Sequence, residues 1–369
     1  MPAQAWDRLV GANDPFLRHA FLLGLEQSGC VGQGSGWVPR HVTCYKDGVL
    51  VGAVPLYEKH HSYGEFVFDF DWAQAAENAG IAYYPKLISA VPFTPATGQR
   101  VLSHPDADQP AVRARLIAHL GHVCSAESYS SLHMLFTTEN ERDVLVEAGF
   151  IPRLGFQFHW DRQPGWHTFE DYLGALKSSV RKQVKKERAK AQSHGLHLDM
   201  LPGAALLPSH REAFWQCYQS TIDKHYSHAY LNRAFVDYLF EHMSEHVLLA
   251  VASRDDKVVA SALFLHRGKH LYGRYWGSLE PREALHFELC YYQPIDWALR
   301  HGIDHFEAGA QGLHKLKRGL IAMPCHSAHF IAHPGLARAI DVHLQRERAF
   351  VQQRINHLAQ HSPYRRAPE

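Results

Sequence analysis

The sequence predicts an α+β protein of two tandem halves, residues 1–160 and 161–369, each with a mixed central sheet flanked by helices. The first observation behind this prediction is a repeated order of patterns, because helix, hairpin, strand, helix, strand, helix and strand follow one another in both halves. The second is that 46% of the 369 residues are hydrophobic, which is enough for two substantial cores.

The first half opens with a helical pattern over 15–27, in which Phe16, Ala20, Leu23 and Gln27 fall on successive turns. The turn residues 46–48 then separate strand patterns over 38–45 and 49–57, which is a hairpin signal. An irregular stretch follows. The remaining elements that we expect are a strand over 87–91, a helix over 110–125, a strand over 132–136, a helix over 139–148 and a strand over 150–160.

The second half repeats this order. Helical patterns precede a hairpin whose tight turn is 254–257, and a third strand follows it. The next helix carries one apolar stripe, at Leu285, Leu289, Tyr292, Ile295 and Leu299. The expected ranges are helices over 204–221 and 231–242, strands over 247–253, 258–266, 271–276, 304–307 and 325–332, a helical turn near Lys315, and a last helix over 334–360.

A dense polar cluster follows the predicted strand 304–307. An acid, an amide, a histidine and three cations lie within twelve residues, in a segment interrupted by glycines at 309, 312 and 319. This combination of charge and permissive backbone at a strand end predicts a site for an anionic or carbonyl-bearing ligand. Its members are Glu307, Gln311, His314, Lys315, Lys317 and Arg318.

A basic segment lies at the start of the second half. Thr168 and Asp171 form a capping-box pattern that opens a helix over 169–193. Between 177 and 190 the local charge is about +6 on a nearly neutral chain. This face is either simply solvated or a track for a polyanion such as tRNA, whose binding would weaken with salt. The cations proposed for nucleic-acid binding are Lys177, Arg181, Lys182, Lys185 and Lys186.

Composition excludes several classes of protein. The formal charge of +1 gives no global argument for nucleic-acid binding, and no segment approaches the ~18 apolar residues of a membrane span. The start of the chain lacks the pattern of a signal peptide, and the six scattered cysteines are typical of reduced thiols, so we expect a cytoplasmic protein. The 29 histidines include His326, His329 and His333 close together, but no spacing matches a strong zinc motif, so no metal site is predicted.

Several longer motifs resemble one family. In the second half these are Gly273-Arg274-Tyr275-Trp276-Gly277, Leu285-His286-Phe287-Glu288 and Gly309-Ala310-Gln311-Gly312 with His314-Lys315, and the first half carries a similar block from Tyr57 to Leu102. Together they are similar to the predicted N-acyltransferases, which are FemAB-like, carry a peptidoglycan-biosynthesis label and belong to the GNAT superfamily. The resemblance covers nearly the whole chain and implies two tandem GNAT-like domains.

The resemblance also implies transfer of an acyl group to an amine, with no resident cofactor. A GNAT enzyme that uses coenzyme A normally has a glycine-rich loop before its central helix. Here that loop, 278–284, has no glycine and carries Glu280 and Glu283. Aminoacyl-tRNA is therefore the favoured co-substrate and acyl-CoA the alternative, with a small-molecule or peptide amine as acceptor. The rival function is a non-catalytic GNAT-like protein that binds RNA or a protein partner through the basic helix.

Roles for single residues follow from this hypothesis. Glu307 is the first candidate base, unless it only pairs with a neighbouring cation. Glu65, Asp69 and Asp71 form a second acidic cluster that would hold the cationic amine, and the first two are also candidate catalytic residues, although Asp69 and Asp71 also fit the exposed face of an edge strand. The residues expected to bind the substrate or its phosphates are Arg274, Tyr275, Gln311, His314, Lys315 and Arg318.

Overall fold

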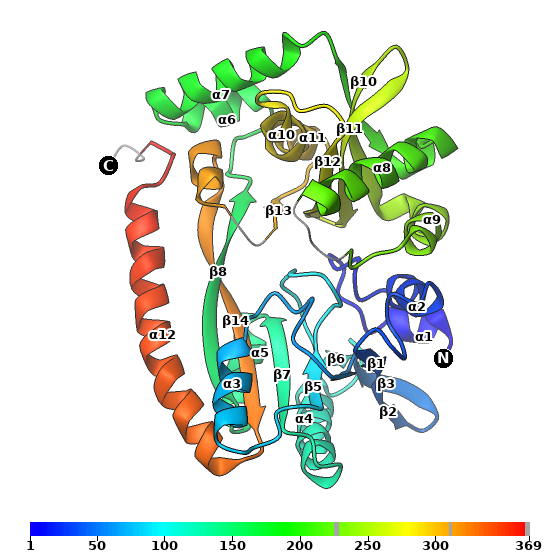
Figure 1. The fold of residues 1–369 in the computed structure, drawn as a ribbon, viewed down its shortest axis with the longest axis vertical. Coiled ribbons are helices and arrows are strands. Elements are labelled where there is room, and N and C mark those ends of the chain that lie inside the picture. The colour runs from blue at the N-terminus through cyan, green and yellow to red at the C-terminus, as the bar shows by residue number, and fades with distance from the viewer. Residues whose placement is uncertain (225–228, 310–311, 366–369) are drawn as a thin grey trace. The chain divides into compact units, whose positions relative to one another are not determined.

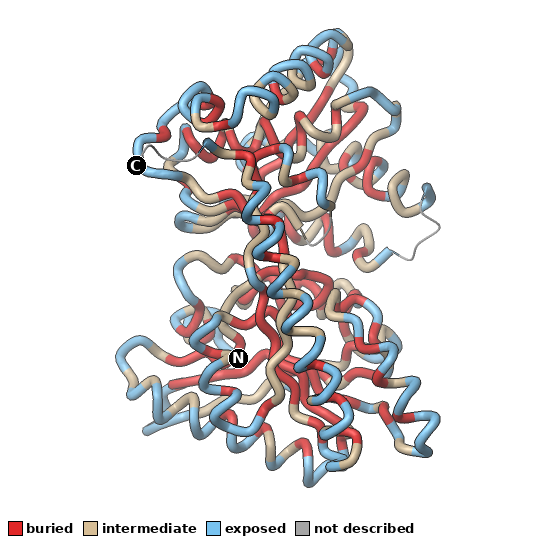
Figure 2. Tube along the Cα trace, turned by 90° about the vertical axis from the view of Figure 1, so that its left-hand side faces the viewer, coloured by how far each residue is buried: buried red, intermediate tan, exposed pale blue. Residues whose placement is uncertain are grey.

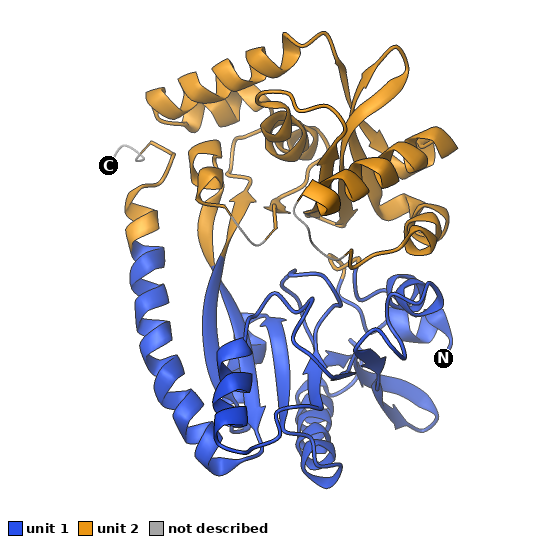
Figure 3. Cartoon of the chain, in the orientation of Figure 1, with its two compact units in different colours: residues 1–11, 16–156, 324–356 blue, residues 12–15, 157–323, 357–369 orange. Residues whose placement is uncertain are grey.

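A computed structural model describes residues 1–224, 229–309 and 312–365 of the chain. Its contacts divide it into two compact units (Figure 3). The first comprises residues 1–11, 16–156 and 324–356, and the second comprises residues 12–15, 157–323 and 357–369. The chain passes from the first unit to the second at 156–157, close to the predicted boundary at 160. Residues 324–356, which the sequence analysis places in the second half, lie in the first unit.

The first unit is built on a mixed sheet with the strand order β1-β4-β5-β7-β14-β8 (Figure 1). β5 and β7 are parallel, and the pairs β1/β4, β4/β5 and β7/β14 are antiparallel. A separate sheet has the order β2-β3-β6. The strands are β1 Trp37–Pro39, β2 Val42–Lys46, β3 Val49–Val54, β4 Tyr57–Lys59, β5 Lys86–Ser89, β6 Leu102–Ser103, β7 Ser131–Thr137, β8 Ile151–Asp161 and β14 Ile321–Ile331.

The predicted hairpin is confirmed as β2 and β3. Asp47 and Gly48 link the two strands, and both have positive φ, at 51° and 77°. Two consecutive residues with positive φ match the right-handed twist of the flanking strands, which is why Asp-Gly suits this turn.

Helices cover the sheets of the first unit and close its cores. α4 packs against β2, β3, β6 and β7, and its residues Leu116, Ile117 and Leu120 join one buried core. α3 and α12 share a second core, to which α12 contributes Leu336 and Ile340. The helices are α1 Ala3–Asp7, α2 His19–Gln27, α3 Phe70–Asn78, α4 Gln109–Ala126, α5 Glu139–Glu147 and α12 Pro334–Gln360, the last of which passes into the second unit after residue 356.

The second unit has its own mixed sheet, in the order β8-β13-β12-β11-β10-β9. β12 and β13 are parallel, and the other neighbours are antiparallel. Figure 2 shows that buried positions concentrate in the strands of each unit, while helices and loops carry most of the exposed ones. The further strands are β9 His197–Pro202, β10 Val247–Arg254, β11 Lys257–Arg267, β12 His270–Ser278 and β13 His305–Glu307.

α8 packs closely on β11 and β12. A Cβ atom on Gly277 of β12 would lie 1.8 Å from the carbonyl oxygen of Cys217 in α8, so this position requires glycine. The helices of the unit are α6 Phe169–Ala175, α7 Ser178–Gln192, α8 Pro208–Lys224, α9 Arg233–His242, α10 Leu285–Phe287 and α11 Gln293–Arg300.

The helix expected after residue 284 is confirmed, with one irregularity. α10 continues through a π-helical turn, Glu288–Tyr292, into α11. All five residues of its predicted apolar stripe are buried, including Leu289 and Ile295. A π-turn widens the helix locally and is common beside functional sites.

Several elements differ from prediction. Residues 70–78, expected to be irregular or an edge strand at Asp69 and Asp71, form α3, because Trp72 and Ala76 lie one turn apart and pack into a core. The basic helix over 169–193 is two helices, since Leu176 turns to an extended ψ of 148° and pairs with Tyr364. α2 begins at His19 and not at 15, and it buries Phe21, Leu22 and Leu25.

The predicted capping box is confirmed at Thr168 and Asp171. All six cysteines are free thiols. Among the described residues, no helix is both long and apolar enough to cross a membrane.

Candidate functional site

A pocket opens where the parallel strands β12 and β13 separate. The two strands pair only over His270–Tyr272 and His305–Glu307, after which β13 ends while β12 continues to Ser278. The pocket lies where the two strands no longer pair. The pocket has a volume of about 290 Å³, and its lining includes Gly273, Arg274, Tyr275 and Trp276 of β12 with Ala308 and Gly309 beyond β13.

A β-bulge shapes the β12 wall of this pocket. Leu263 of β11 pairs with Tyr275 and Phe264 pairs with Gly273, which makes Arg274 the extra residue of the ladder. A bulge bends its strand and re-aims side chains, and bulges are frequent beside active sites. Both Arg274 and Tyr275, predicted to bind substrate, line the pocket, and the Arg274 guanidinium lies 5.3 Å from the Tyr275 ring centroid.

Lys315 supplies a buried cation to the opposite wall. Its side chain comes from the 3-10 turn Leu313–Arg318, and the residue is only 3% exposed. The ammonium group donates hydrogen bonds to the carbonyl oxygens of Ala308, at 2.6 Å, and Gly309, at 2.7 Å. Burial lowers the pKa of Lys315 to about 8, so the group is charged at neutral pH and loses its proton just above it.

Two histidines lie at the same pocket in their neutral form. Burial, aided by the neighbouring cationic groups, lowers the pKa of His286 to about 4. Burial and Arg318 also lower the pKa of His314, which lies on the exposed rim with its Nε2 atom 2.9 Å from the Tyr291 hydroxyl. Both imidazoles are therefore uncharged at neutral pH, and each can accept a hydrogen bond or a proton through one ring nitrogen.

Arg318 does not line the pocket, but it contacts the 3-10 turn that carries His314 and Lys315. Its guanidinium donates two hydrogen bonds to the Glu187 carboxylate, at 3.1 and 2.7 Å, and one to the carbonyl oxygen of His314, at 2.7 Å. It also lies 3.3 Å from the ring centroid of Phe287. Tyr292 donates to the same carboxylate, so Glu187 of α7 anchors the 3-10 turn to the central helix.

Glu307, the first candidate base, points elsewhere. Alternation along β13 places it on the face opposite Phe306, and it is not among the residues that line the pocket. Its carboxylate is 3.5 Å from Nε2 of His305, and its cross-strand partner is His159. The structure therefore groups Glu307 with histidines.

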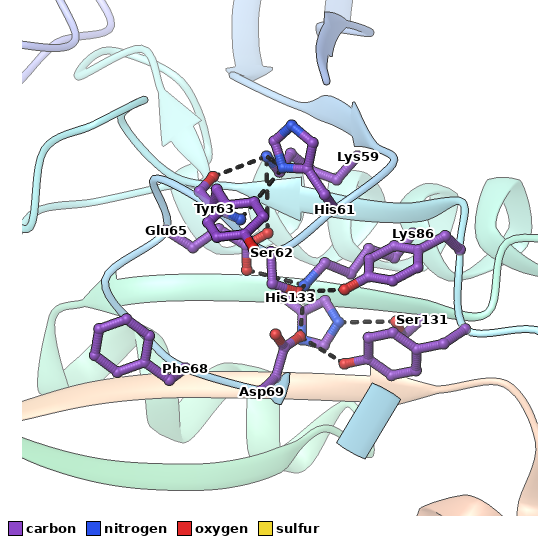
Figure 4. Close-up of polar contacts among 12 residues, drawn as sticks. Lys59, His61, Ser62, Tyr63, Glu65, Phe68, Asp69, Lys86, Ser131 and His133 are labelled. Atoms are coloured by element: carbon purple, nitrogen blue, oxygen red, sulfur yellow. Dashed lines mark hydrogen bonds and ion pairs between the residues drawn. The ribbon is translucent and has the colours of Figure 1, made fainter. Parts of the chain in front are cut away.

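The first unit holds a second polar cluster, which is fully buried (Figure 4). Lys59 and Lys86 are direct cross-strand partners on β4 and β5, and neither is measurably exposed. Two ammonium groups at such a pair repel each other. Glu65 and Asp69, from the segment before α3, lie beside them, and each is 3% exposed. The cluster therefore balances two buried cations with two buried acids.

Lys86 is the hub of this buried cluster. Its ammonium group donates to Glu65 Oε2 at 2.9 Å, to Ser62 Oγ at 3.0 Å and to Asp69 Oδ2 at 2.5 Å. The Tyr83 hydroxyl also donates to Asp69. Lys59 is more distant, at 3.9 Å from the other Glu65 oxygen. The chain's own lysines thus occupy the place in which the sequence hypothesis puts a cationic acceptor.

The two acids of the cluster titrate differently. Burial raises the pKa of Glu65 to about 7 against the pull of Lys86. Burial also opposes ionisation of Asp69, but Lys86 and further hydrogen bonds outweigh it and lower the pKa to about 2. Burial lowers the pKa of Lys59 to about 7. At neutral pH Lys86 is therefore charged and contacts one ionised carboxylate, Asp69, and one carboxyl group that is about half protonated, Glu65.

This arrangement predicts a pH-dependent stability. The folded protein keeps the proton on Glu65 to about pH 7, whereas the unfolded chain releases it near 4.5, so raising the pH across this interval favours unfolding. Relative to a Glu65→Gln variant, the wild type should lose about 1–3 kcal/mol of unfolding free energy between these pH values. Urea denaturation at a series of pH values measures this difference. A matched Glu147→Gln variant, whose carboxyl group is exposed on α5, should show no such trend, and a flat Glu65 difference would contradict the assignment.

His326 and His329 of β14, and His333 just after it, have internal partners. His329 faces His133 of β7, with their Nδ1 atoms 2.7 Å apart, and the Ser131 hydroxyl lies 2.8 Å from Nε2 of His133. His326 contacts Arg142 at 3.0 Å, and His333 accepts a hydrogen bond from the backbone of Leu336. These are polar histidines with structural partners.

The predicted basic face is present on α7. Lys182, Lys185 and Lys186 lie on the side of the helix away from the buried residues Val184 and Ala191, whereas Arg181 is half-buried and lies one turn before Val184. All three of these lysines are exposed, and Lys185 forms a 3.4 Å ion pair with exposed Glu170. Lys177 instead donates to the carbonyl oxygen of Ser362 at 2.7 Å.

The structure thus brings together four of the predicted substrate-binding residues, Arg274, Tyr275, His314 and Lys315. Gln311 lies outside the described residues. Asp71 is exposed in the first turn of α3, apart from the buried acids.

Sequence reasoning missed the pocket residues His286, Cys290 and Tyr291, together with the two buried lysines. The apolar stripe from Leu285 to Leu299 was the available signal for the first three. Residues beside such a stripe lie at the edge of the buried face, where they can line a pocket. No local sequence pattern marks Lys59 and Lys86 as buried partners, because they meet only through the register of β4 against β5.

Comparisons with known proteins give the fold a context. FemX matches with a TM-score of 0.57 and 11% identity, over 92% of this chain and 98% of that one. The C-terminal domain of a putative lysylphosphatidylglycerol synthetase from Agrobacterium fabrum matches with a TM-score of 0.57 and 11% identity, over 93% and 95%. A tandem GNAT protein from the clavulanic acid biosynthesis pathway reaches 0.42 at 11% identity, over 85% and 88%.

At 11% identity, the likeness to FemX and to the synthetase domain is one of fold. No curated protein sequence matches the chain. A family model described as peptidoglycan biosynthesis/recognition matches residues 1–366, nearly the full length. The chain is therefore a member of the FemAB-like family.

Proposed function

We propose that this protein transfers an acyl or aminoacyl group from an activated donor to an amine, and that the reaction takes place in the pocket beside β12. The observation that carries the proposal is that a buried cation, Lys315, and an uncharged imidazole, His286, line the same pocket, where two parallel strands separate. Membership of the FemAB-like family supports the same reaction class and favours a peptidoglycan-related amine as acceptor.

The chemistry requires three groups. The acceptor nitrogen attacks the donor carbonyl, a C–N bond forms, and the ester C–O bond breaks with the electron pair leaving on oxygen. Negative charge builds on the carbonyl oxygen, and the Lys315 ammonium group is placed to stabilise it. His286 takes the proton of the attacking amine and returns it to the leaving oxygen, while Arg274 and Tyr275 orient the donor.

Aminoacyl-tRNA is the donor that we favour over acyl-CoA. The loop before α10 has no glycine between Ser278 and Ala284 to let backbone amides surround a diphosphate. Glu280 in this loop forms ion pairs with Arg254 and Arg282, so the two cations nearest the loop are already neutralised by a carboxylate. The fold shared with a putative lysylphosphatidylglycerol synthetase is a further argument for an aminoacyl group.

The basic face of α7 provides the test of this donor. A Lys182→Glu/Lys186→Glu variant should bind tRNA more weakly, and the slope of log affinity against log salt should fall by about 1–2, because two phosphate contacts are lost. Filter binding of a charged tRNA pool at several salt concentrations measures this, with acyl-CoA as competitor. The control is a Lys224→Glu/Lys257→Glu variant, which makes the same charge change at exposed positions off the face.

Each outcome of this experiment bears on the proposal. Equal salt slopes for both variants would remove α7 from tRNA binding. Displacement of tRNA by acyl-CoA, or stabilisation by acyl-CoA without tRNA binding, would make acyl-CoA the donor. Salt-sensitive tRNA binding without transfer to any amine would support the rival function, a binding protein that has lost its chemistry.

A further inference from the structure

We propose that one face of the β8/β13 ladder is a binding site for a divalent first-row metal ion, with Zn²⁺ as the ion that fits best. His159, His305 and Glu307 would be the ligands, and Asp161 would orient His305. The site is independent of the proposed transfer reaction, because these side chains do not line the pocket.

Strand register places the four side chains together. β8 and β13 are antiparallel, and His305 pairs with Asp161 while Glu307 pairs with His159. Positions two apart on a strand share a face, and direct partners share it too. Two successive cross-strand pairs therefore present two imidazoles and two carboxylates on one side, while Phe306 and Trp160 face the other.

The distances suit a metal ion. One ligand atom from each of His159, His305 and Glu307 can be chosen so that all lie within 4.8 Å of one another. Nε2 of His305 is 3.5 Å from the nearer Glu307 oxygen. Ligands at the usual 2.0–2.1 Å from tetrahedral zinc are separated by about 3.3 Å, so closure needs only small side-chain rotations.

The outer carboxylate is already in place. Nδ1 of His305 is 2.5 Å from Asp161 Oδ1, on the ring side away from Glu307. A histidine ligand commonly donates its other N–H to a carboxylate, which fixes the tautomer and turns the free nitrogen to the metal. His305 is held in this orientation, and two nitrogen ligands with one oxygen ligand form a set that zinc accepts.

The ligand set is reachable from solvent. His159 and Glu307 are 5% and 4% exposed, whereas the side chains of His305 and Asp161 are 19% and 32% exposed. A cation can therefore enter past His305, and a water molecule would complete four-fold coordination. A bound ion would cross-link the three-residue strand β13 to β8 and so stabilise their pairing.

Metal titration of the full-length protein tests the proposal. After chelator treatment and dialysis, the protein is titrated with Zn²⁺ by calorimetry, and Co²⁺ absorption reports the coordination geometry. We expect one site with a tetrahedral cobalt spectrum and a zinc-dependent rise in melting temperature. His159→Gln and Glu307→Gln should each weaken binding at least 100-fold, and Asp161→Asn by about 10–100-fold.

The control removes a pair of exposed histidines that would account for non-specific zinc binding at the surface. His357 and His361 lie one turn apart at the end of α12, with ring centroids 4.5 Å apart. A His357→Gln/His361→Gln variant should keep the tight site and its cobalt spectrum. Loss of binding in this variant, with normal binding in His159→Gln, would overturn the proposal, as would the absence of stoichiometric binding by the wild type. Folding of each variant is checked by circular dichroism, and the milder Asp161→Asn change supplies a graded readout.

Discussion

Replacing Lys86 by methionine should lower the free energy of unfolding by about 3–5 kcal/mol, because it leaves buried carboxylate charge without its cation. Lys86 has no exposed surface, and it donates to Glu65, Asp69 and Ser62 at once. Methionine keeps most of the side-chain volume, so the loss reports charge and hydrogen bonding more than packing. Denaturant unfolding at pH 7 measures the difference.

Two further variants separate charge from shape in this test. Lys46→Met, at an exposed position of β2, should change stability by no more than about 0.5 kcal/mol. Adding Asp69→Asn and Glu65→Gln to Lys86→Met should recover part of the loss, since no uncompensated charge remains. A Lys86→Met cost as small as that of Lys46→Met would show that the cluster does not carry the charges assigned to it.

Replacing Lys315 by methionine should reduce the turnover of acyl transfer by about 10²–10³-fold, as expected when one oxyanion donor is lost. Its ammonium group is the buried cation of the pocket wall and also holds the carbonyl groups of Ala308 and Gly309. Single-turnover kinetics with a bound donor separate this loss from weaker binding. Lys317→Met, which removes an exposed lysine two residues away, is the matched control and should leave turnover unchanged.

The pH profile distinguishes a charge role of Lys315 from a purely structural one. Because burial lowers its pKa to about 8, the wild-type rate should fall above that pH as the ammonium group loses its proton. The residual rate of Lys315→Met should lack this limb. A variant that turns over like the wild type, or that keeps the alkaline limb, would exclude Lys315 from stabilising the transition state.

The fold was predictable where the signal is local. The Asp47-Gly48 hairpin, the stripe from Leu285 to Leu299 and the C-terminal helix each follow from patterns within about 25 residues. α3 was missed because only Trp72 and Ala76 are buried, which is too short a stripe to recognise. The placement of residues 324–356 in the first unit was missed because β14 pairs with β7, nearly 200 residues away in sequence, and such a pairing leaves no local trace.

The site was predictable to the same degree. Arg274, Tyr275, His314 and Lys315 were recognisable as polar residues at strand ends and in glycine-flanked turns, and they converge on one pocket. Glu307 was predicted to belong to this cluster, but its place on a three-residue strand puts it beside His305 and His159 and not in the pocket lining. His159 and His305, which have metal-ligand geometry, lie about 146 residues apart in the sequence, so no short spacing motif could have predicted them.

The order in which the ribosome makes this chain limits when it can fold. In the sheet of the first unit, β14 lies between β7 and β8, yet it is made about 160 residues after β8. Until it arrives, β7 has an open edge, and the core beside α3 lacks Leu336, Ile340 and Leu344 from α12. The first unit is begun first, but it receives residues 324–356 only after residues 157–323 of the second unit have been made. The edge of β7 therefore stays open to non-native strand pairing during that part of synthesis.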